Sequence, residues 1–290
     1  FCNDGKGNLW AGSDGNGLYI ITGEKSLTTN YNQGQAIPHI RYRECELWIA
    51  NWGNGVTIKE QNSRKEQQIK NLPGNGVHDV LPVKGGAWIA IDHYGLVYYD
   101  RRTNSTLYAK NSKIPVFNTR WGQFPTQLMQ DHKGRIWAAT SDGICCWDGH
   151  TYKKYGYKNG IDQETITMME DHLHRIWFIS KRNGLNLLDE KKAKYINFNQ
   201  RYRLPDGLKS MTEDKKGNLW ICSSDRIYCI NPSKGISLEY PLASEIGDDS
   251  FYPSALYIGQ NGMLYAGTTF GMLTINLQQL NETPQRQAVT

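Results

Sequence analysis

The sequence predicts an all-β protein, a seven-bladed β-propeller built from four-stranded antiparallel blades. A short unit recurs along the chain as DGKGNLWAGS from residue 4, DHKGRIWAATS from 131, DHLHRIWFIS from 171 and DKKGNLWICSS from 214. Aligning the copies on their aromatic residue gives seven positions: Trp10, Trp48, Trp88, Trp137, Trp177, Trp220 and Tyr265. They are 38 to 49 residues apart, the spacing of propeller blades. Seven such units fill the chain, so we predict one propeller over residues 1–290.

The composition agrees with strands joined by tight turns. The chain has 17 Tyr, 9 Trp and 29 Gly, residue types that favour strands and turns over helices. Its net charge of +5 is mild for 290 residues and does not indicate a nucleic-acid partner. No apolar stretch approaches the roughly 20 residues that span a bilayer. The chain begins at Phe1 without a visible signal peptide, and we interpret it as a mature or excised fragment of a longer protein.

The first element of each unit is a turn between two strands. It opens on an acidic residue in four copies: Asp4, Asp131, Asp171 and Asp214. Three residues later stands Gly7, Gly134 or Gly217, with His174 as the departure. Glycine supplies the positive φ that a tight turn needs, and aspartate accepts hydrogen bonds from turn amides. We therefore assign these aspartates to turn chemistry rather than to catalysis.

The second strand of each unit is apolar on both faces. One face carries the aromatic, and the other carries the aliphatic residue before it: Leu9, Leu47, Ile136, Ile176, Leu219 and Leu264. Two residues after the aromatic stands a small residue in six copies: Gly12, Ala50, Ala90, Ala139, Cys222 and Gly267. A strand that is apolar on both faces is covered on both. Radially packed blades provide two such neighbours.

A third strand follows in each unit, and a less regular fourth strand is expected at the outer edge. A glycine precedes the third strand in every copy except the sixth, where Arg226 takes its place. In this register the chain starts in an innermost strand, and residues 286–290 (RQAVT) form the outermost strand of the last blade. No strand is then exchanged to close the ring, so closure depends on packing between the first and last blades, unless the tail pairs elsewhere.

Neither the cysteines nor the histidines predict a metal site or a cofactor. The six cysteines contain no C-x-x-C pair, and the adjacent Cys145 and Cys146 point to opposite faces of a strand. We expect them to pack as small apolar residues rather than to form disulfides. His132, His172 and His174 belong to turns on the face opposite His93, and no H-x-x-x-H pattern is present. We predict no metal, no cofactor and no catalytic residue.

The repeated unit resembles the two-component regulator propeller repeat. The copies that carry the resemblance are TEDKKGNLWICSSDRIYCIN, MQDHKGRIWAATSDGICCWDGHTYKKY, EDHLHRIWFISKRNGLNLLD and NDGKGNLWAGSDGNGLYII. The second, third and seventh copies lack the acidic turn, and the seventh has Tyr265 in place of Trp. Propellers of this family are extracytoplasmic sensing parts of bacterial hybrid two-component kinases that control glycan degradation.

The resemblance implies a periplasmic, non-enzymatic sensor that detects an oligosaccharide and signals to a kinase outside this chain. It implies as partners a glycan and a second propeller or protomer of the same sensor, with the membrane reached only through other segments. Two alternatives remain open. One is a lyase or hydrolase with a histidine–carboxylate pair in the central funnel, since streptogramin lyases are also seven-bladed. The other is a protein-interaction scaffold.

Ligands of propellers usually bind where the loops between second and third strands converge. Four aromatic residues in these loops have no evident packing role: Trp52, His93, Tyr94 and Phe270. They are candidates for stacking on sugar rings, although each can equally cover a neighbouring loop. The longest loop, NSKIPVFNTRWGQFPTQ from residue 111, contributes Arg120 and Trp121.

Basic residues also collect on this face of blades four to six. They are Arg120, Lys181, Arg182, Arg201, Arg203 and Arg226. Guanidinium groups bind carboxylates and sulfates, so the cluster is either a solvated basic face or a site for an acidic oligosaccharide. In the second case we expect the ligand off-centre, near Arg120, Trp121, Arg182 and Arg226.

Overall fold

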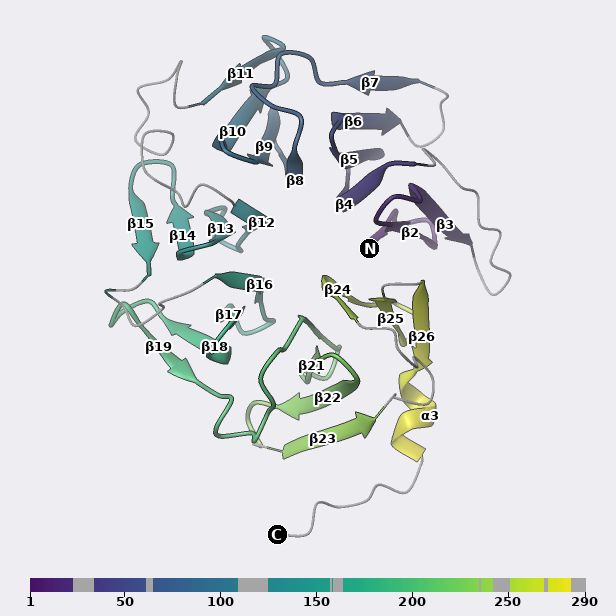
Figure 1. Cartoon of the computed structure of the whole chain (residues 1–290), viewed down its shortest axis with the longest axis vertical. Helices are drawn as coiled ribbons and strands as arrows, with labels where there is room; N and C mark the ends of the chain where they lie inside the picture. Colours follow the sequence, from purple (N-terminus) through teal and green to yellow (C-terminus); the bar gives the residue numbers. More distant parts are fainter. Residues whose placement is uncertain are drawn as a thin grey trace.

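Seven antiparallel sheets stand around a central axis (Figure 1), which confirms the predicted seven-bladed propeller. The computed structural model describes residues 1–22, 34–60, 65–108, 125–156, 158, 164–234, 236–241, 251–268 and 271–282. Within these residues, five blades have four strands, and the first and last blades have three. The expected outermost strand at 286–290 lies outside the described residues.

Each blade runs from an inner strand beside the axis to an edge strand at the rim. The inner strands are β1 (Cys2–Asn3), β4 (Ala36–Arg43), β8 (Val77–Val83), β12 (Pro125–Gln130), β16 (Thr165–Glu170), β20 (Ser210–Glu213) and β24 (Phe251–Ile258). The second strands, which carry the repeated aromatic, are β2 (Asn8–Gly12), β5 (Glu46–Trp52), β9 (Gly86–Ile91), β13 (Ile136–Thr140), β17 (Ile176–Ser180), β21 (Leu219–Cys222) and β25 (Met263–Thr268).

The outer half of each blade repeats the same antiparallel pairing. The third strands are β3 (Leu18–Thr22), β6 (Gly55–Glu60), β10 (Gly95–Asp100), β14 (Gly143–Trp147), β18 (Gly184–Asp189), β22 (Arg226–Asn231) and β26 (Met272–Asn276). The edge strands are β7 (Glu66–Gln68), β11 (Ser105–Leu107), β15 (Tyr152–Tyr155), β19 (Lys194–Asn197) and β23 (Ile236–Pro241). One helix, α3 (Leu277–Glu282), follows the last blade. No helix among the described residues is both long enough and apolar enough to cross a membrane.

The acidic turn residue is a buried acceptor that organises its hairpin. In the fourth blade, Asp131 Oδ1 accepts the backbone N–H groups of Lys133 and Arg135 at 3.0 and 2.9 Å. Its Oδ2 accepts the indole N–H of Trp137 at 2.8 Å. Burial opposes ionisation of Asp131, but these hydrogen bonds prevail and lower its pKa below the ordinary value. The predicted turn role is confirmed, and the bond to the tryptophan adds to it.

The hydrogen bond between the turn aspartate and the tryptophan, which we call the clamp, recurs wherever the sequence has the acidic turn. The carboxylate–indole distances are 3.3 Å for Asp4 and Trp10, 2.7 Å for Asp171 and Trp177, and 2.9 Å for Asp214 and Trp220. The second blade has no acidic residue at the position equivalent to Asp131. Its turn passes through Glu44 and Cys45, whose φ angles are 52° and 63°. There the buried Nε1 of Trp48 has no hydrogen-bond partner within the described part of the chain.

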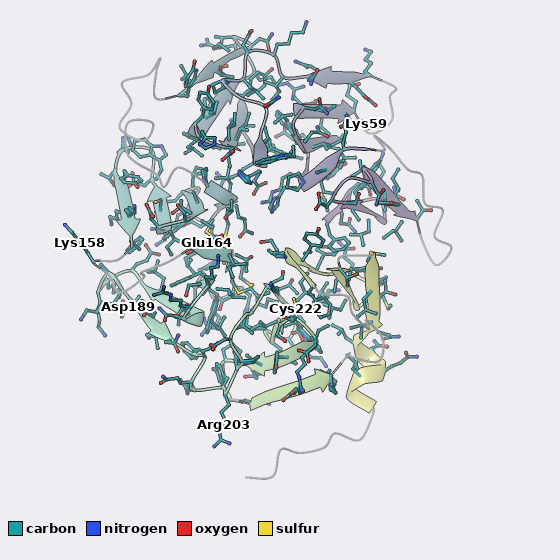
Figure 2. All side chains as sticks on the ribbon, in the orientation of Figure 1. Lys59, Lys158, Glu164, Asp189, Arg203 and Cys222 are labelled. Carbon is teal, nitrogen blue, oxygen red and sulfur yellow. The ribbon has the colours of Figure 1, made fainter. Side chains whose placement is uncertain are left out.

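The core lies between the blades rather than inside them. Six clusters of buried apolar residues each join two consecutive blades within the described residues. Cys145 packs toward the third blade and Cys146 toward the fifth, as expected for opposite faces of one strand. All six cysteines are free thiols. In Figure 2, Cys222 lies within this interior, whereas Lys158 and Arg203 extend from the rim.

The small residues on the second strands allow close approach of the next blade. A Cβ at Gly12 would come within 2.4 Å of the Ile37 carbonyl oxygen in the next blade, whereas a Cβ at Gly267 would come within 2.9 Å of Ala255 in its own blade. Ala50 and Ala139 are fully buried. The predicted reason for small residues here is confirmed at Gly12.

The first and last blades meet without sharing a strand among the described residues. The rings of Phe1 and Tyr265 lie 6.3 Å apart, and the Tyr252 hydroxyl donates to Asp14 Oδ2 at 2.8 Å. Among the described residues, the first and last blades therefore meet through packing and polar contacts. Residues 286–290, on which the expected closure without an exchanged strand also depends, lie outside the described residues, so that expectation stays a prediction.

We expect Asp131→Ala to lower the free energy of unfolding by about 3 kcal/mol, because it leaves the Trp137 indole N–H and two turn amides without an acceptor. Chemical denaturation measures the change. The matched control is Asp206→Ala, at an exposed loop position, which should cost less than about 0.5 kcal/mol. Adding Trp137→Phe to Asp131→Ala should recover part of the loss. Equal effects of the two aspartate variants would contradict the clamp.

Candidate ligand-binding surface

The inner strands enclose a cavity of about 480 Å³ on the axis. Its wall mixes methionines with polar groups. The methionines are Met129, Met168, Met169 and Met211, and the polar residues include His39, Arg41, Gln127 and Glu170. Glu170 and Gln130 are the last residues of β16 and β12, so the cavity reaches the end of the channel where the turns between first and second strands lie. We call that end of the propeller the turn face.

A polar network in the channel wall joins three blades. Asp79 is fully buried, and its Oδ2 accepts Arg41 Nη2 at 2.7 Å and the Leu128 backbone N–H at 2.8 Å. Arg41 also donates to the Leu128 carbonyl oxygen at 3.0 Å. These residues come from β4, β8 and β12, the inner strands of consecutive blades. The carboxylate is thus engaged in holding blades together.

His39 lies beside this network without a direct hydrogen bond to the carboxylate. Its Nδ1 donates to the His78 carbonyl oxygen at 2.9 Å, and its Nε2 is 4.0 Å from Asp79 Oδ2. Burial lowers the pKa of His39 below the ordinary value, and this effect outweighs the attraction of Asp79. His39 is therefore a neutral imidazole with its proton on Nδ1.

The opposite end of the propeller, the loop face, is formed by the loops between second and third strands. Over blades two and three, four side chains form a continuous row there. The Trp52 ring meets the His78 ring edge-on at 4.8 Å, and His78 Nε2 is 3.9 Å from Asp92 Oδ1. His93 Nε2 lies 3.4 Å from Asp92 Oδ2. Trp52 remains 44% exposed at the end of this row.

Tyr94 continues the row toward a polar groove. It is 38% exposed, and its ring lies against Gly74, where a Cβ would come within 2.9 Å of the ring. Gly74 also lines a groove of about 500 Å³ whose polar side chains include Asn54, Gln68, Asn71 and Asn75. Asn75 Nδ2 donates to the Gly53 carbonyl oxygen at 2.9 Å, directly after Trp52 in the chain. Both exposed aromatic side chains thus lie close to the groove, although neither lines it.

The structure brings three of the predicted site residues together: Trp52, His93 and Tyr94. The links between them are His78 and Asp92, which sequence analysis did not single out. Asp92 was visible as the polar residue of the IDHYG loop, but His78 lies in an inner strand and had no motif to mark it. Its place next to Trp52 follows only from the packing of blade two on blade three.

The predicted basic residues lie elsewhere on the ring. Arg182 is exposed in the loop of blade five. Arg226 is the first residue of β22, pairs with Glu239 and lies 3.4 Å from Asp225. Its φ is not positive, in line with the expected change of loop path. Arg120, Trp121 and Phe270 lie outside the described residues, so the off-centre basic site stays a prediction.

Other cations of that cluster already have partners. Lys181 Nζ is 2.9 Å from Glu164 Oε2, and the Arg201 guanidinium lies 5.4 Å from the Phe198 ring centroid. The positive charge on blades five and six is therefore partly compensated. Over blades two and three, by contrast, the surface combines exposed aromatic faces with amide side chains.

The fold and this surface define a class: a seven-bladed propeller whose loop face carries an aromatic and polar surface. A scan against protein-family models and a search of curated proteins both give no match. Among solved structures, the chain matches the extracellular domain of a hybrid two-component system from B. thetaiotaomicron, with TM-score 0.79 and 22% identity. The match covers 98% of this chain and 39% of that one.

Two further solved structures share the fold. One is the extracellular domain of another hybrid two-component system of B. thetaiotaomicron, with TM-score 0.66 and 14% identity over 98% of this chain and 35% of that one. The other is a catalytically inactive virginiamycin B lyase from Staphylococcus aureus with quinupristin, with TM-score 0.72 and 14% identity over 94% and 92%. Likeness at these identities establishes the architecture, and function has to be argued from the sites.

The buried histidines predict a loss of stability in mild acid. Burial lowers the pKa of both His39 and His78 in the folded protein. Above about pH 6.5 both residues are neutral whether folded or unfolded. As the pH falls through that value, the unfolded chain takes up protons that the folded one does not. The free energy of unfolding should then decrease by at most about 1.4 kcal/mol per pH unit for each histidine.

Thermal unfolding between pH 7 and pH 5 measures this slope. His39→Gln, whose amide can still donate to the His78 carbonyl, should flatten it, and His150→Gln serves as the control at an exposed position. The lowered pKa values of Asp4, Asp131 and Asp214 act only below about pH 4, outside this window. An unchanged slope in His39→Gln would contradict the prediction.

Proposed function

We propose that the chain is the extracytoplasmic, ligand-sensing propeller of a two-component sensor. The proposal is supported by the full-length structural likeness to extracellular domains of hybrid two-component systems. The chain spans about two fifths of the first of these extracellular domains. In this proposal, the kinase and the membrane attachment belong to other parts of the sensor. The protein would then act in the periplasm without being an enzyme itself.

We infer that the sensed ligand is an oligosaccharide bound on the loop face over blades two and three. The observation that carries this inference is that two exposed aromatic side chains, Trp52 and Tyr94, lie close to an amide-lined groove without lining it: Tyr94 lies against Gly74, and Trp52 directly precedes Gly53, whose carbonyl accepts from Asn75. Sugar rings present C–H faces that stack on aromatic side chains, and their hydroxyls pair with amides. Only five large apolar side chains are exposed among the described residues, and two of them lie near this groove.

An acidic oligosaccharide near Arg120, Trp121, Arg182 and Arg226 is the second location to consider. It is favoured by the density of cations on that part of the ring and disfavoured by the pairing of Arg226 with Glu239.

The other predicted partner, a second propeller or protomer, would dock on one face of the ring. In a scaffold role that contact would be the function itself.

A lyase acting in the channel is the competing enzymatic hypothesis. It is supported by the likeness to virginiamycin B lyase over nearly the whole of both chains. It requires a histidine paired with a carboxylate, and the channel offers His39 at 4.0 Å from Asp79. Steady product formation from a bound glycan, abolished by His39→Ala, would support this hypothesis over the sensor.

For the glycan site, we expect Trp52→Ala and Tyr94→Ala each to weaken binding of a responsive oligosaccharide about tenfold or more, because each removes a stacking platform. Glycan arrays identify the ligand, and calorimetry measures its affinity. Met272→Ala is the matched control, because it removes an exposed apolar side chain from another blade. If both aromatic variants bind as tightly as the wild type, the groove over blades two and three is not the site.

For the basic site, we expect binding of an acidic glycan to weaken in Arg120→Ala/Arg182→Ala by a few kcal/mol if that site is used. Added salt should then weaken wild-type binding more than binding by the double variant. Titrations at two salt concentrations measure both effects. If affinity and salt dependence are unchanged, the ligand binds elsewhere on the ring.

A further inference from the structure

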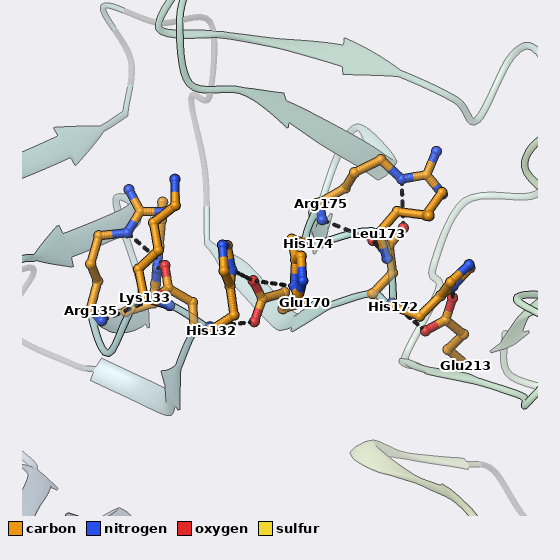
Figure 3. Close-up of polar contacts among 12 residues, drawn as sticks. His132, Lys133, Arg135, Glu170, His172, Leu173, His174, Arg175 and Glu213 are labelled. Carbon is orange, nitrogen blue, oxygen red and sulfur yellow. Dashed lines mark hydrogen bonds and ion pairs between the residues drawn. The ribbon is translucent and has the colours of Figure 1, made fainter.

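Two histidines and one glutamate meet on the turn face between blades four and five (Figure 3). His132 lies in the turn after β12, Glu170 ends β16, and His174 lies in the turn after β16. One ligand atom from each side chain lies within 4.8 Å of the other two. Across the described part of the chain, this is the single group of three or more potential metal ligands from His, Cys, Asp and Glu.

Both imidazoles approach the same carboxylate. His132 donates its backbone N–H to Glu170 Oε2 at 2.8 Å and forms a short contact from Nδ1 to Oε1. His174 Nδ1 is 3.5 Å from that same Oε1. The two rings stack with centroids 3.8 Å apart and planes 23° apart. Two ring nitrogens and one carboxylate oxygen therefore converge on a common region.

We propose that His132, Glu170 and His174 form a binding site for a divalent transition-metal ion of the zinc class. Zinc sites with three protein ligands combine histidine and carboxylate and leave the fourth position to water. Zinc–ligand bonds of about 2.0–2.1 Å place neighbouring ligand atoms about 3.4 Å apart in a tetrahedron, and His174 Nδ1 lies 3.5 Å from Glu170 Oε1. To bind one ion, the stacked rings have to rotate so that both Nδ1 lone pairs point at it, and the short contact between His132 and Glu170 has to lengthen. Magnesium and calcium prefer sets made only of oxygen, so this set favours zinc over them.

The neighbouring blade provides an internal comparison. His172 and Glu213 repeat the first half of the cluster, with the backbone N–H bond at 2.8 Å and the Nδ1 contact at 2.5 Å. At the place of His174, however, that turn has Gly217 at φ 78°. A Cβ at Gly217 would lie 2.6 Å from the His172 ring. The histidine–glutamate pair alone is therefore a latch between blades, and the third ligand distinguishes the proposed site.

His174 occupies a backbone position that favours glycine. Its φ is 61°, whereas the equivalent Gly134 and Gly217 both have φ of 78°. Residues other than glycine are disfavoured at this φ. The backbone strain at His174 therefore slightly destabilises the turn, and it places a second imidazole beside Glu170. Glu170 also lines the axial cavity, so the ion would sit at the rim of the channel.

Metal binding exchanges protons in a defined way. In the metal-free cluster, Nδ1–H groups of the imidazoles face Glu170 Oε1 as donors. On binding, each Nδ1 lone pair goes to the ion, and each neutral imidazole carries its proton on Nε2. The carboxylate contributes one negative charge.

The test uses Zn²⁺ alone, added to the tag-free chain at pH 7.5 and followed by calorimetry and thermal unfolding. We expect one ion per chain and a rise in Tm of about 5 °C at saturating zinc. His174→Gly should weaken zinc affinity about 100-fold or more and abolish the rise, while its metal-free Tm should not fall, because glycine suits this backbone position. Glu170→Gln should also weaken zinc binding, and it changes the size of the side chain less than His174→Gly does.

His172→Ala is the matched control, because it removes a histidine from the equivalent latch one blade further on. It should keep wild-type zinc affinity and the zinc-dependent rise in Tm, even if its own metal-free Tm is lower. Excess Mg²⁺ should not compete. The proposal is wrong if the wild type binds no zinc, if His174→Gly binds it as tightly as the wild type, or if His172→Ala loses it equally. Each of these results would leave the cluster as a latch only.

Discussion

The hydrogen bond that the tryptophan indole N–H of the second strand donates to the aspartate of the preceding turn is the constraint on which each blade with an acidic turn depends. In the fourth blade, Asp131 fixes the turn through its amides and the second strand through the Trp137 indole N–H. With its polar atom satisfied, the tryptophan can be fully buried against the next blade. Trp48 shows the contrast, because its buried Nε1 has no partner among the described residues.

The two faces of the ring differ in role because the segments that connect the strands differ between them. Turns on the turn face are short and repeat, so they can form latches between blades, such as His132 with Glu170 and His172 with Glu213. Bidentate pairs add to them, as between Arg135 and Glu190. Loops on the loop face vary in length and sequence, so aromatic and amide side chains can be presented there at little cost to the fold.

The channel between these faces is mainly a structural element. Arg41 and Asp79 tie three inner strands together through Leu128, and the surrounding methionines supply adaptable apolar packing. A ligand bound on the loop face over blades two and three would act on blades that this network connects, whereas an ion bound at the turn face would reach the network only through blade four. Such an arrangement gives a rigid ring, in which recognition is separated from the contacts that maintain the architecture.

The sequence by itself determined the blade number, the turn aspartates, the two-faced second strands and the close approach at Gly12, because each depends on residues within one repeat or on its period. It also marked Trp52, His93 and Tyr94 as loop residues. Tertiary structure alone decided that His78 packs against Trp52 and that His132 meets Glu170 and His174. The Trp52–His78 and His132–Glu170 contacts cross from one blade to the next, and the sequence leaves no local pattern for partners such as His132 and Glu170, which are 38 residues apart.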